Sequence, residues 1–334
     1  MKNRKFLTRL SPLMTLCVLA ILPMGGYTVS AQTPPTGKPA VPPKVEPTVP
    51  KAAQFPFTVN YRPWKGLMLV DAISTGNTPA QFVIATGLNV NTVTPDDAAR
   101  LQMTIQETKV RVTALDNVTE AKQGQIKAIT FGLHKEENIP AAIVDVAALL
   151  SRFPQPDAPA GWLGAPFLSA FNVTLDFRNH AVIFDKPTAP FPKEVGILVP
   201  IKVKEGRIYA KISIPGTKPF EALIDTGAVG TLIPTEIATK LKLKATDTIA
   251  IVRPDGKPGK IARALVPKFS LGKLEMRGIH VAYYPADAPG SDPNFAVIGL
   301  DILRRYRVTI SYSKQQMFFG PLISANPTED PLNP

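Results

Sequence analysis

The chain has 334 residues, 45% hydrophobic and 19% charged, so it can bury a core along most of its length and can form about two domains. The 35 prolines and 22 glycines favour a protein of short strands and many loops. Although the formal net charge is +12, the basic residues are scattered among acidic ones without an aromatic–basic run, which argues against a nucleic-acid partner.

Residues 1–31 have the pattern of a secretory signal peptide. A basic start, MKNRKFLTR, precedes an apolar stretch from Leu10 to about Gly26, and VSA at 29–31 offers small residues for cleavage. The stretch is short for a membrane span and holds two prolines. We therefore expect export to the periplasm or the extracellular space, with no stable membrane insertion after signal removal. An uncleaved N-terminal anchor is the less favoured alternative.

A proline-rich linker is predicted over 32–53, where seven prolines leave little that could form a core. The last residues, 323–334, are predicted to be a disordered tail. Between these ends, the sequence divides into two segments, 54–186 and 187–322.

The two segments form an internal repeat. A shift of 140 residues places 78–103 on 218–243 without a gap, so that Thr86-Gly87 meets Thr226-Gly227. A shift of 135 places 161–177 on 296–312. The chain is therefore expected to contain two copies of one architecture.

Each copy is predicted to consist mainly of strands. Residues 197–225 alternate between apolar and polar side chains and turn at EG and PGTKP, as hairpins do. A short helix is expected after the Thr-Gly strand in each copy, with Thr94 as cap and Pro95 as first helical residue in the first copy. GLDILRRYRVTIS predicts a further short helix before the last strand.

The second copy resembles the retropepsin-like aspartic proteases, in particular their bacterial single-lobe relatives. The resemblance rests on LIDTGA at 223–228 and VIGLDIL at 297–303. It implies an all-β fold of two tandem retropepsin-like β-barrel lobes with a few short helices. It also implies that Asp225 is the catalytic carboxylate, that Thr226 braces its loop and that Gly227 lets the backbone approach a substrate. The family's pattern assigns structural support of this loop to Ala228, Val297, Ile298 and Gly299.

The first copy is degenerate at the catalytic position, because Ala85 stands where the second copy has Asp225. Thr86 and Gly87 are retained. In an aspartic protease, two carboxylates a hydrogen bond apart share one proton. The charged carboxylate takes a proton from the attacking water, and the protonated one donates to the developing oxyanion. A pair of Ala85 and Asp225 would have a base without its acid.

Two architectures are consistent with this sequence. In the first, which the retained Thr86 favours, the two halves close on each other within one chain. In the second, Asp225 halves from two chains pair in a homodimer, and the first half becomes an accessory domain.

The sequence supports two main hypotheses for the function. The first is an exported aspartic endopeptidase that hydrolyses a peptide or protein substrate through water activated by Asp225. The alternative is a catalytically dead pseudoprotease that binds peptides, because Ala85 replaces the partner carboxylate. A third, weaker hypothesis assigns the site to an unrelated interaction with cell-envelope material.

The remaining motifs add little chemistry. The hairpin predicted at 252–264 lies where the family has its substrate-covering flap, and an ordinary surface hairpin explains it equally well. Asp301 is interpreted as a structural helix cap, and Trp64 and Trp162 as core or interface residues. The three histidines lack ligand spacing, so we expect neither a metal nor a cofactor.

Overall fold

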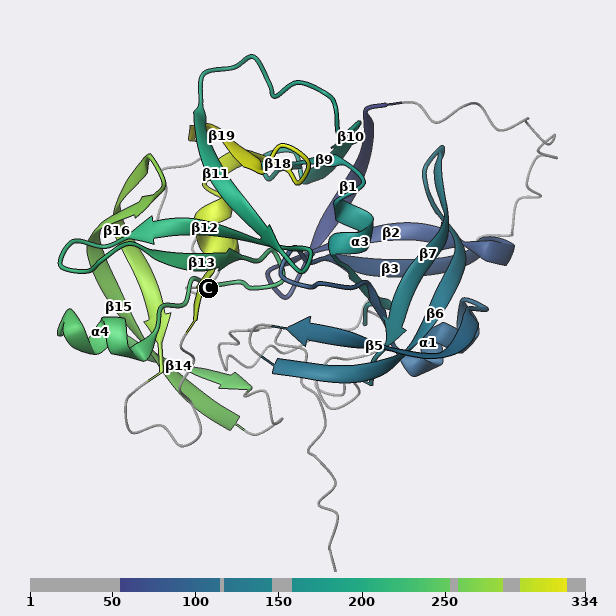
Figure 1. Ribbon diagram of the computed structural model, residues 1–334, viewed down its shortest axis with the longest axis horizontal. Helices are drawn as coiled ribbons and strands as arrows, with labels where there is room; N and C mark the ends of the chain where they lie inside the picture. The colour runs from purple at the N-terminus through teal and green to yellow at the C-terminus, as the bar shows by residue number, and fades with distance from the viewer. Residues whose placement is uncertain (1–54, 115–116, 146–157, 253–257, 285–294, 323–334) are drawn as a thin grey trace, which may run out of the picture.

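The computed structural model describes residues 55–114, 117–145, 158–252, 258–284 and 295–322. The predicted signal peptide, the linker and the C-terminal tail lie outside the described residues. Two sets of strands, one from each half, form the two lobes in Figure 1. Among the described residues, no helix is both long and apolar enough to cross a membrane.

The elements of the first lobe, in chain order, are β1 (Phe57–Trp64), β2 (Leu67–Ser74), η1 (Thr75–Asn77), β3 (Thr78–Ile84), β4 (Thr92–Val93), α1 (Pro95–Arg100), β5 (Thr104–Ala114), β6 (Asn117–Phe131), β7 (His134–Ile143), β8 (Gly161–Leu163), α3 (Ala165–Leu168), β9 (Asn172–Asp176) and β10 (Ala181–Asp185).

Those of the second lobe are β11 (Ile197–Lys204), β12 (Arg207–Ser213), β13 (Phe220–Ile224), α4 (Thr235–Lys240), β14 (Asp247–Val252), β15 (Pro258–Leu271), β16 (Leu274–Tyr283), β17 (Ala296–Ile298), α5 (Leu300–Leu303), β18 (Tyr306–Ser311) and β19 (Gln316–Leu322).

The two lobes repeat the same pairing. β3 lies parallel to β8 in the first lobe, and β13 lies parallel to β17 in the second. Each lobe opens with a hairpin whose two-residue turn has positive φ at both positions, at Lys65-Gly66 and Glu205-Gly206. Such turns match the twist of the flanking strands, which fixes the register of β1 with β2 and of β11 with β12. The predicted all-β fold with two repeated lobes is confirmed.

One six-stranded antiparallel sheet joins the lobes, in the order β1–β10–β9–β18–β19–β11. Its centre is the pair β9–β18, where Thr174 lies opposite Thr309. The two buried hydroxyl groups are 2.8 Å apart and hydrogen-bonded. Since these threonines are equivalent under the 135-residue shift, the lobes are related by an approximate twofold axis at this point.

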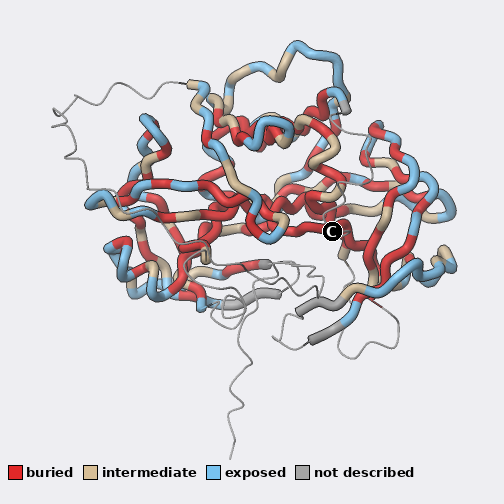
Figure 2. The backbone as a smooth tube through the Cα atoms, turned by 180° about the vertical axis from the view of Figure 1, so that it is seen from behind, coloured by how far each residue is buried: buried red, intermediate tan, exposed pale blue. Residues whose placement is uncertain are grey.

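The apolar face of each strand is buried in a core that runs through both lobes and the shared sheet (Figure 2). Each short α-helix packs buried side chains against this core. In α1, Thr94 caps the helix by accepting from the Asp97 N–H at 3.1 Å, and Pro95 is the first helical residue, so that prediction is confirmed. In α4, Ile237 packs with Leu241 against the core.

Hairpins of both lobes lie on the side of the molecule away from the shared sheet (Figure 1). β5 pairs with β6 in the first lobe, and β14 pairs with β15 in the second. The predicted hairpin around 252–264 therefore forms, although its tip, 253–257, lies outside the described residues. Arg263, which is 8% exposed, donates through Nε to both oxygens of Asp247 at 3.0 Å and anchors this hairpin.

Candidate active site

The residues singled out by the repeat lie in two loops that begin where β3 and β13 end. Each loop is held by the parallel strand beside it. The Ala85 N–H donates to the Leu163 carbonyl at 3.0 Å, and the Asp225 N–H donates to the Ile298 carbonyl at 3.0 Å. The two loops face each other at the junction of the lobes, where hydrogen bonds join them.

Thr86 and Thr226 join the loops by reciprocal hydrogen bonds. The N–H of each threonine donates to the hydroxyl of the other at 3.1 Å. The Thr86 hydroxyl donates to the Ile224 carbonyl at 2.8 Å, and the Thr226 hydroxyl donates to the Ile84 carbonyl at 2.7 Å. Neither threonine is exposed to solvent. The two halves of the site therefore meet within one chain.

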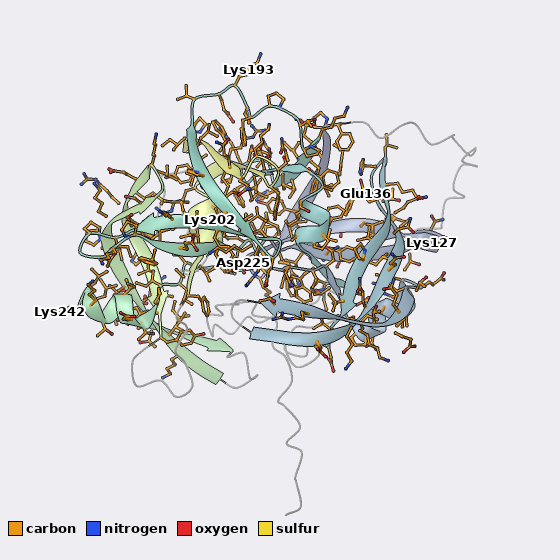
Figure 3. The ribbon with its side chains drawn as sticks, viewed as in Figure 1. Lys127, Glu136, Lys193, Lys202, Asp225 and Lys242 are labelled. Atoms are coloured by element: carbon orange, nitrogen blue, oxygen red, sulfur yellow. The ribbon has the colours of Figure 1, made fainter. Side chains whose placement is uncertain are left out.

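Asp225 lies at this junction, between the lobes (Figure 3). Its Oδ1 accepts from the Gly227 N–H at 2.7 Å and from the Gly87 N–H at 3.1 Å, so both loops contribute a donor. A Cβ atom at position 87 would lie 2.2 Å from the Asp225 Cγ. Only glycine at this position lets the first loop approach the carboxylate.

Burial dominates the electrostatics of Asp225. Its side chain is 6% exposed, and burial raises the pKa of the carboxyl from 3.8 to about 6. The N–H groups of Gly227 and Gly87, and then the positive charge of Arg207, lower this pKa and offset part of the rise. Among the described residues, no second carboxylate contributes to the pKa of Asp225.

Ala85 occupies the matching position of the first loop and is buried. A Cβ atom built on Gly227 would lie 3.0 Å from the Asp225 Oδ1 and 3.4 Å from the Ala85 Cβ. The carboxylate and the methyl group thus lie on either side of the same glycine. Of the two matching loop positions, one carries a carboxyl group and the other a methyl group, whereas the mechanism of an aspartic protease uses two carboxyl groups.

The predicted supporting residues surround the Asp225 loop. Ala228 accepts from the Leu300 N–H at 2.8 Å, and Val297 exchanges hydrogen bonds of 2.9 Å in both directions with the backbone of Leu232. Ile298 lies beside Ile224 in the parallel ladder.

Gly299 fits against the backbone of the same loop. A Cβ atom at this position would lie 2.5 Å from the Gly230 carbonyl oxygen, and the Gly299 N–H donates to the Thr231 hydroxyl at 3.2 Å. The late glycine is therefore required by the close approach of two segments of backbone.

Asp301 is a half-buried structural residue that does not occupy the N-cap position, but its carboxylate accepts from the Ile302 N–H at 2.9 Å in the first turn of its helix. Gly299 is the cap of α5, and Asp301 lies in the first turn. Its carboxylate accepts from the Thr231 N–H at 3.0 Å and from the Thr231 hydroxyl at 2.7 Å. Burial raises the pKa of Asp301. In the first lobe, where Pro166 replaces it, Asn91 accepts from the Gly164 N–H at 2.8 Å and holds the equivalent loop.

Arg207, whose charge lowers the pKa of Asp225, was not predicted from the sequence. It begins β12, directly after the Glu205-Gly206 turn, and its guanidinium lies 5.6 Å from the ring centre of Tyr209. The turn itself reaches the other lobe, since a Cβ atom at Gly206 would lie 2.8 Å from the Ala165 Cβ. The repeat contained the signal, because the 140-residue shift places Arg207 on the buried Leu67.

Within the described ranges, no group of three or more His, Cys, Asp and Glu side chains is arranged to hold a metal ion.

Comparison with known proteins adds a family match. The family model described as aspartyl protease matches two regions, residues 70–167 and 210–302. Comparison with curated proteins found no match.

Two solved structures align with most of the chain. Basic 7S globulin from soybean aligns at 12% identity with a TM-score of 0.46, over 79% of this chain and 94% of its own. Aspartic proteinase from Irpex lacteus aligns at 12% identity with a TM-score of 0.47, over 82% of this chain and 99% of its own.

Proposed function

The chain belongs to the aspartyl protease family, and we propose that it binds an extended peptide segment between its two lobes without hydrolysing it. The single observation that carries this proposal is the position of Ala85. It lies beside Asp225 in the same chain, at the place where the second carboxylate of a protease would be.

Hydrolysis would require the missing carboxyl group. Asp225 can accept a proton from water as the water attacks, but the methyl group of Ala85 cannot donate to the developing oxyanion. General acid–base partners are typically each worth about 10²–10⁴-fold in rate. Without the second carboxyl group, the site can bind a peptide but has no general acid to donate a proton to the oxyanion.

Asp225 retains a role in binding under this proposal. With a pKa raised to about 6, it is a charged hydrogen-bond acceptor at neutral pH and a donor at more acid pH. A peptide N–H group bound at the junction would therefore be held most tightly above this pKa, because hydrogen bonds to an ionised acceptor are stronger than neutral ones.

Asp225-dependent peptide hydrolysis is the second candidate function. It is favoured by the hydrogen bonds that hold the carboxylate in place, because the Asp225 Oδ1 accepts from both the Gly227 and the Gly87 N–H groups. A second Asp225 from another chain is a poor source of the missing acid. To meet it, the loop would have to break the reciprocal bonds between Thr86 and Thr226.

The proposal places the protein in the periplasm or outside the cell, on the basis of the signal-like pattern of residues 1–31. Sequencing the N-terminus of the protein recovered from the cell envelope or medium tests this. A start near Gln32 supports cleavage and export, and an intact Met1 on a membrane-bound protein contradicts it.

The test of function combines binding with product analysis. The purified protein is titrated into dye-labelled, unstructured peptides, with anisotropy as the readout and mass spectrometry of the same samples. We expect saturable binding and intact peptides. Cleavage that disappears in Asp225→Asn would establish the second candidate instead, and a folded protein that binds no peptide would refute both.

A further inference from the structure

The two lobes present different chemistry beside their loops. In the first lobe, Thr92, Ala142 and Trp162 form a set that we name the Trp162 face. The equivalent residues of the second lobe are Leu232, Ala282 and Val297, which we name the Val297 face. The 140-residue shift relates the first two members of each set and the 135-residue shift relates the third.

The members of the Trp162 face point to one side of the sheet. Thr92 lies directly opposite Trp162 in an antiparallel pair and directly opposite Ala142 in a parallel pair. Residues that are directly opposite in a sheet project their side chains to the same face. The second lobe repeats this register, because Leu232 bridges both Ala282 and Val297.

The Trp162 face carries two polar atoms that no described residue pairs. The Trp162 Nε1 and the Thr92 Oγ1 are both buried, and neither has a hydrogen-bond partner among the residues that the structure describes. Buried donors are nearly always paired in folded proteins, because an unpaired donor loses its bond to water without replacement. Two such atoms on neighbouring strands indicate that a further polar group completes this face.

The Val297 face has no such atoms and is wholly apolar. Its three members form a cluster with Ala228, Ile261 and Tyr284 that is separate from the main core. This cluster adjoins the site, since the Ala228 N–H donates to the Asp225 carbonyl at 3.2 Å.

The Trp162 face adjoins the first loop, because the carbonyl of the next residue, Leu163, accepts from the Ala85 N–H. Val297 is placed equivalently, because the carbonyl of the next residue, Ile298, accepts from the Asp225 N–H. The two faces therefore flank the junction at equivalent positions, one polar and one apolar.

We propose that the bound peptide is asymmetric, with a carboxamide side chain, Asn or Gln, held at the Trp162 face and an apolar side chain held at the Val297 face. This inference rests on the proposed peptide binding and specifies its ligand. A carboxamide satisfies both unpaired atoms, because its oxygen accepts from the indole N–H and its NH₂ donates to the Thr92 hydroxyl. A carboxylate would bring a buried charge, and an aliphatic side chain would leave both atoms unpaired.

The test uses short capped peptides that differ only by Asn or its near isostere Leu, placed at each position in turn. The protein carries Trp64→Phe, so that Trp162 is the one remaining tryptophan of the two in the sequence and its fluorescence reports binding. Anisotropy with the unmodified protein gives the same dissociation constants independently. At one position, we expect the Asn peptide to bind at least about fivefold more tightly than the Leu peptide.

Thr92→Val tests the assignment to this face, because valine keeps the shape of threonine and removes the hydroxyl. The preference for Asn should fall to about equality in Thr92→Val and persist in Thr58→Val, which makes the same change at an exposed position of β1. The inference is overturned if peptides bind with no Asn preference at any position, as when an ordered water fills the Trp162 face. It is also overturned if the preference survives Thr92→Val. Failure of every peptide to bind would instead refute the proposed function itself.

Discussion

Replacing Asp225 by asparagine should stabilise the protein at neutral pH. Asparagine keeps an oxygen that can accept from Gly87 and Gly227 but carries no charge. Burial raises the pKa of Asp225 from 3.8 to about 6, a difference of about two pH units, which corresponds to about 3 kcal/mol of unfolding free energy at ~1.4 kcal/mol per unit.

The sign follows from proton linkage. The folded protein binds the proton of Asp225 more tightly than the unfolded chain does. The resulting stabilisation is complete below about pH 4 and is lost as the pH rises through about 6. The wild type should therefore lose about 3 kcal/mol relative to Asp225→Asn between acid and neutral pH.

The assay is urea denaturation of both proteins across this pH range, with Asp96→Asn as a control for the loss of one exposed carboxylate. The difference in unfolding free energy between Asp225→Asn and the wild type should grow with pH, while the control difference stays nearly constant. If the curves of Asp225→Asn and the wild type run parallel, Asp225 is not buried as a charged group at neutral pH.

Three further experiments test the junction and the axis between the lobes. Ala85→Asp restores a second carboxyl group beside Asp225 and should raise cleavage of an unstructured protein by about 10²-fold or more; an inactive, folded variant would contradict the assigned geometry. Thr86→Val leaves the buried Thr226 N–H and Ile224 carbonyl without the hydroxyl that pairs them. It should lower the unfolding free energy by about 2 kcal/mol or more in urea denaturation, whereas Thr86→Ser should recover most of the loss. Thr174→Val should cost about 1 kcal/mol, and adding Thr309→Val should cost little more, because the double variant leaves no hydroxyl unpaired; strictly additive losses would refute a direct bond.

The repeat made the central junction predictable from the sequence. Thr86-Gly87 and Thr226-Gly227 fall on each other in the alignment, and a threonine kept in a degenerate copy indicated that the two loops meet. The same alignment showed that Ala85 stands where the second carboxylate would be. These features depend on local motifs whose backbone geometry is repeated, so a sequence comparison can find them.

Features that depend on contacts between distant strands were not predictable in the same way. The unpaired atoms of Thr92 and Trp162 become visible only when β4 and β8 are placed side by side. Asp301 was expected to cap its own helix; its carboxylate accepts from the Ile302 N–H of that helix, but it also binds Thr231, seventy residues earlier in the chain.

The most direct test of the central claim is cleavage of an unstructured protein by the wild type and by Asp225→Asn, from acid to neutral pH. We expect the same negligible cleavage in both samples, alongside peptide binding by the wild type. Cleavage by the wild type that is lost in Asp225→Asn would contradict this claim, because it would mean that a second acid reaches Asp225 despite Ala85.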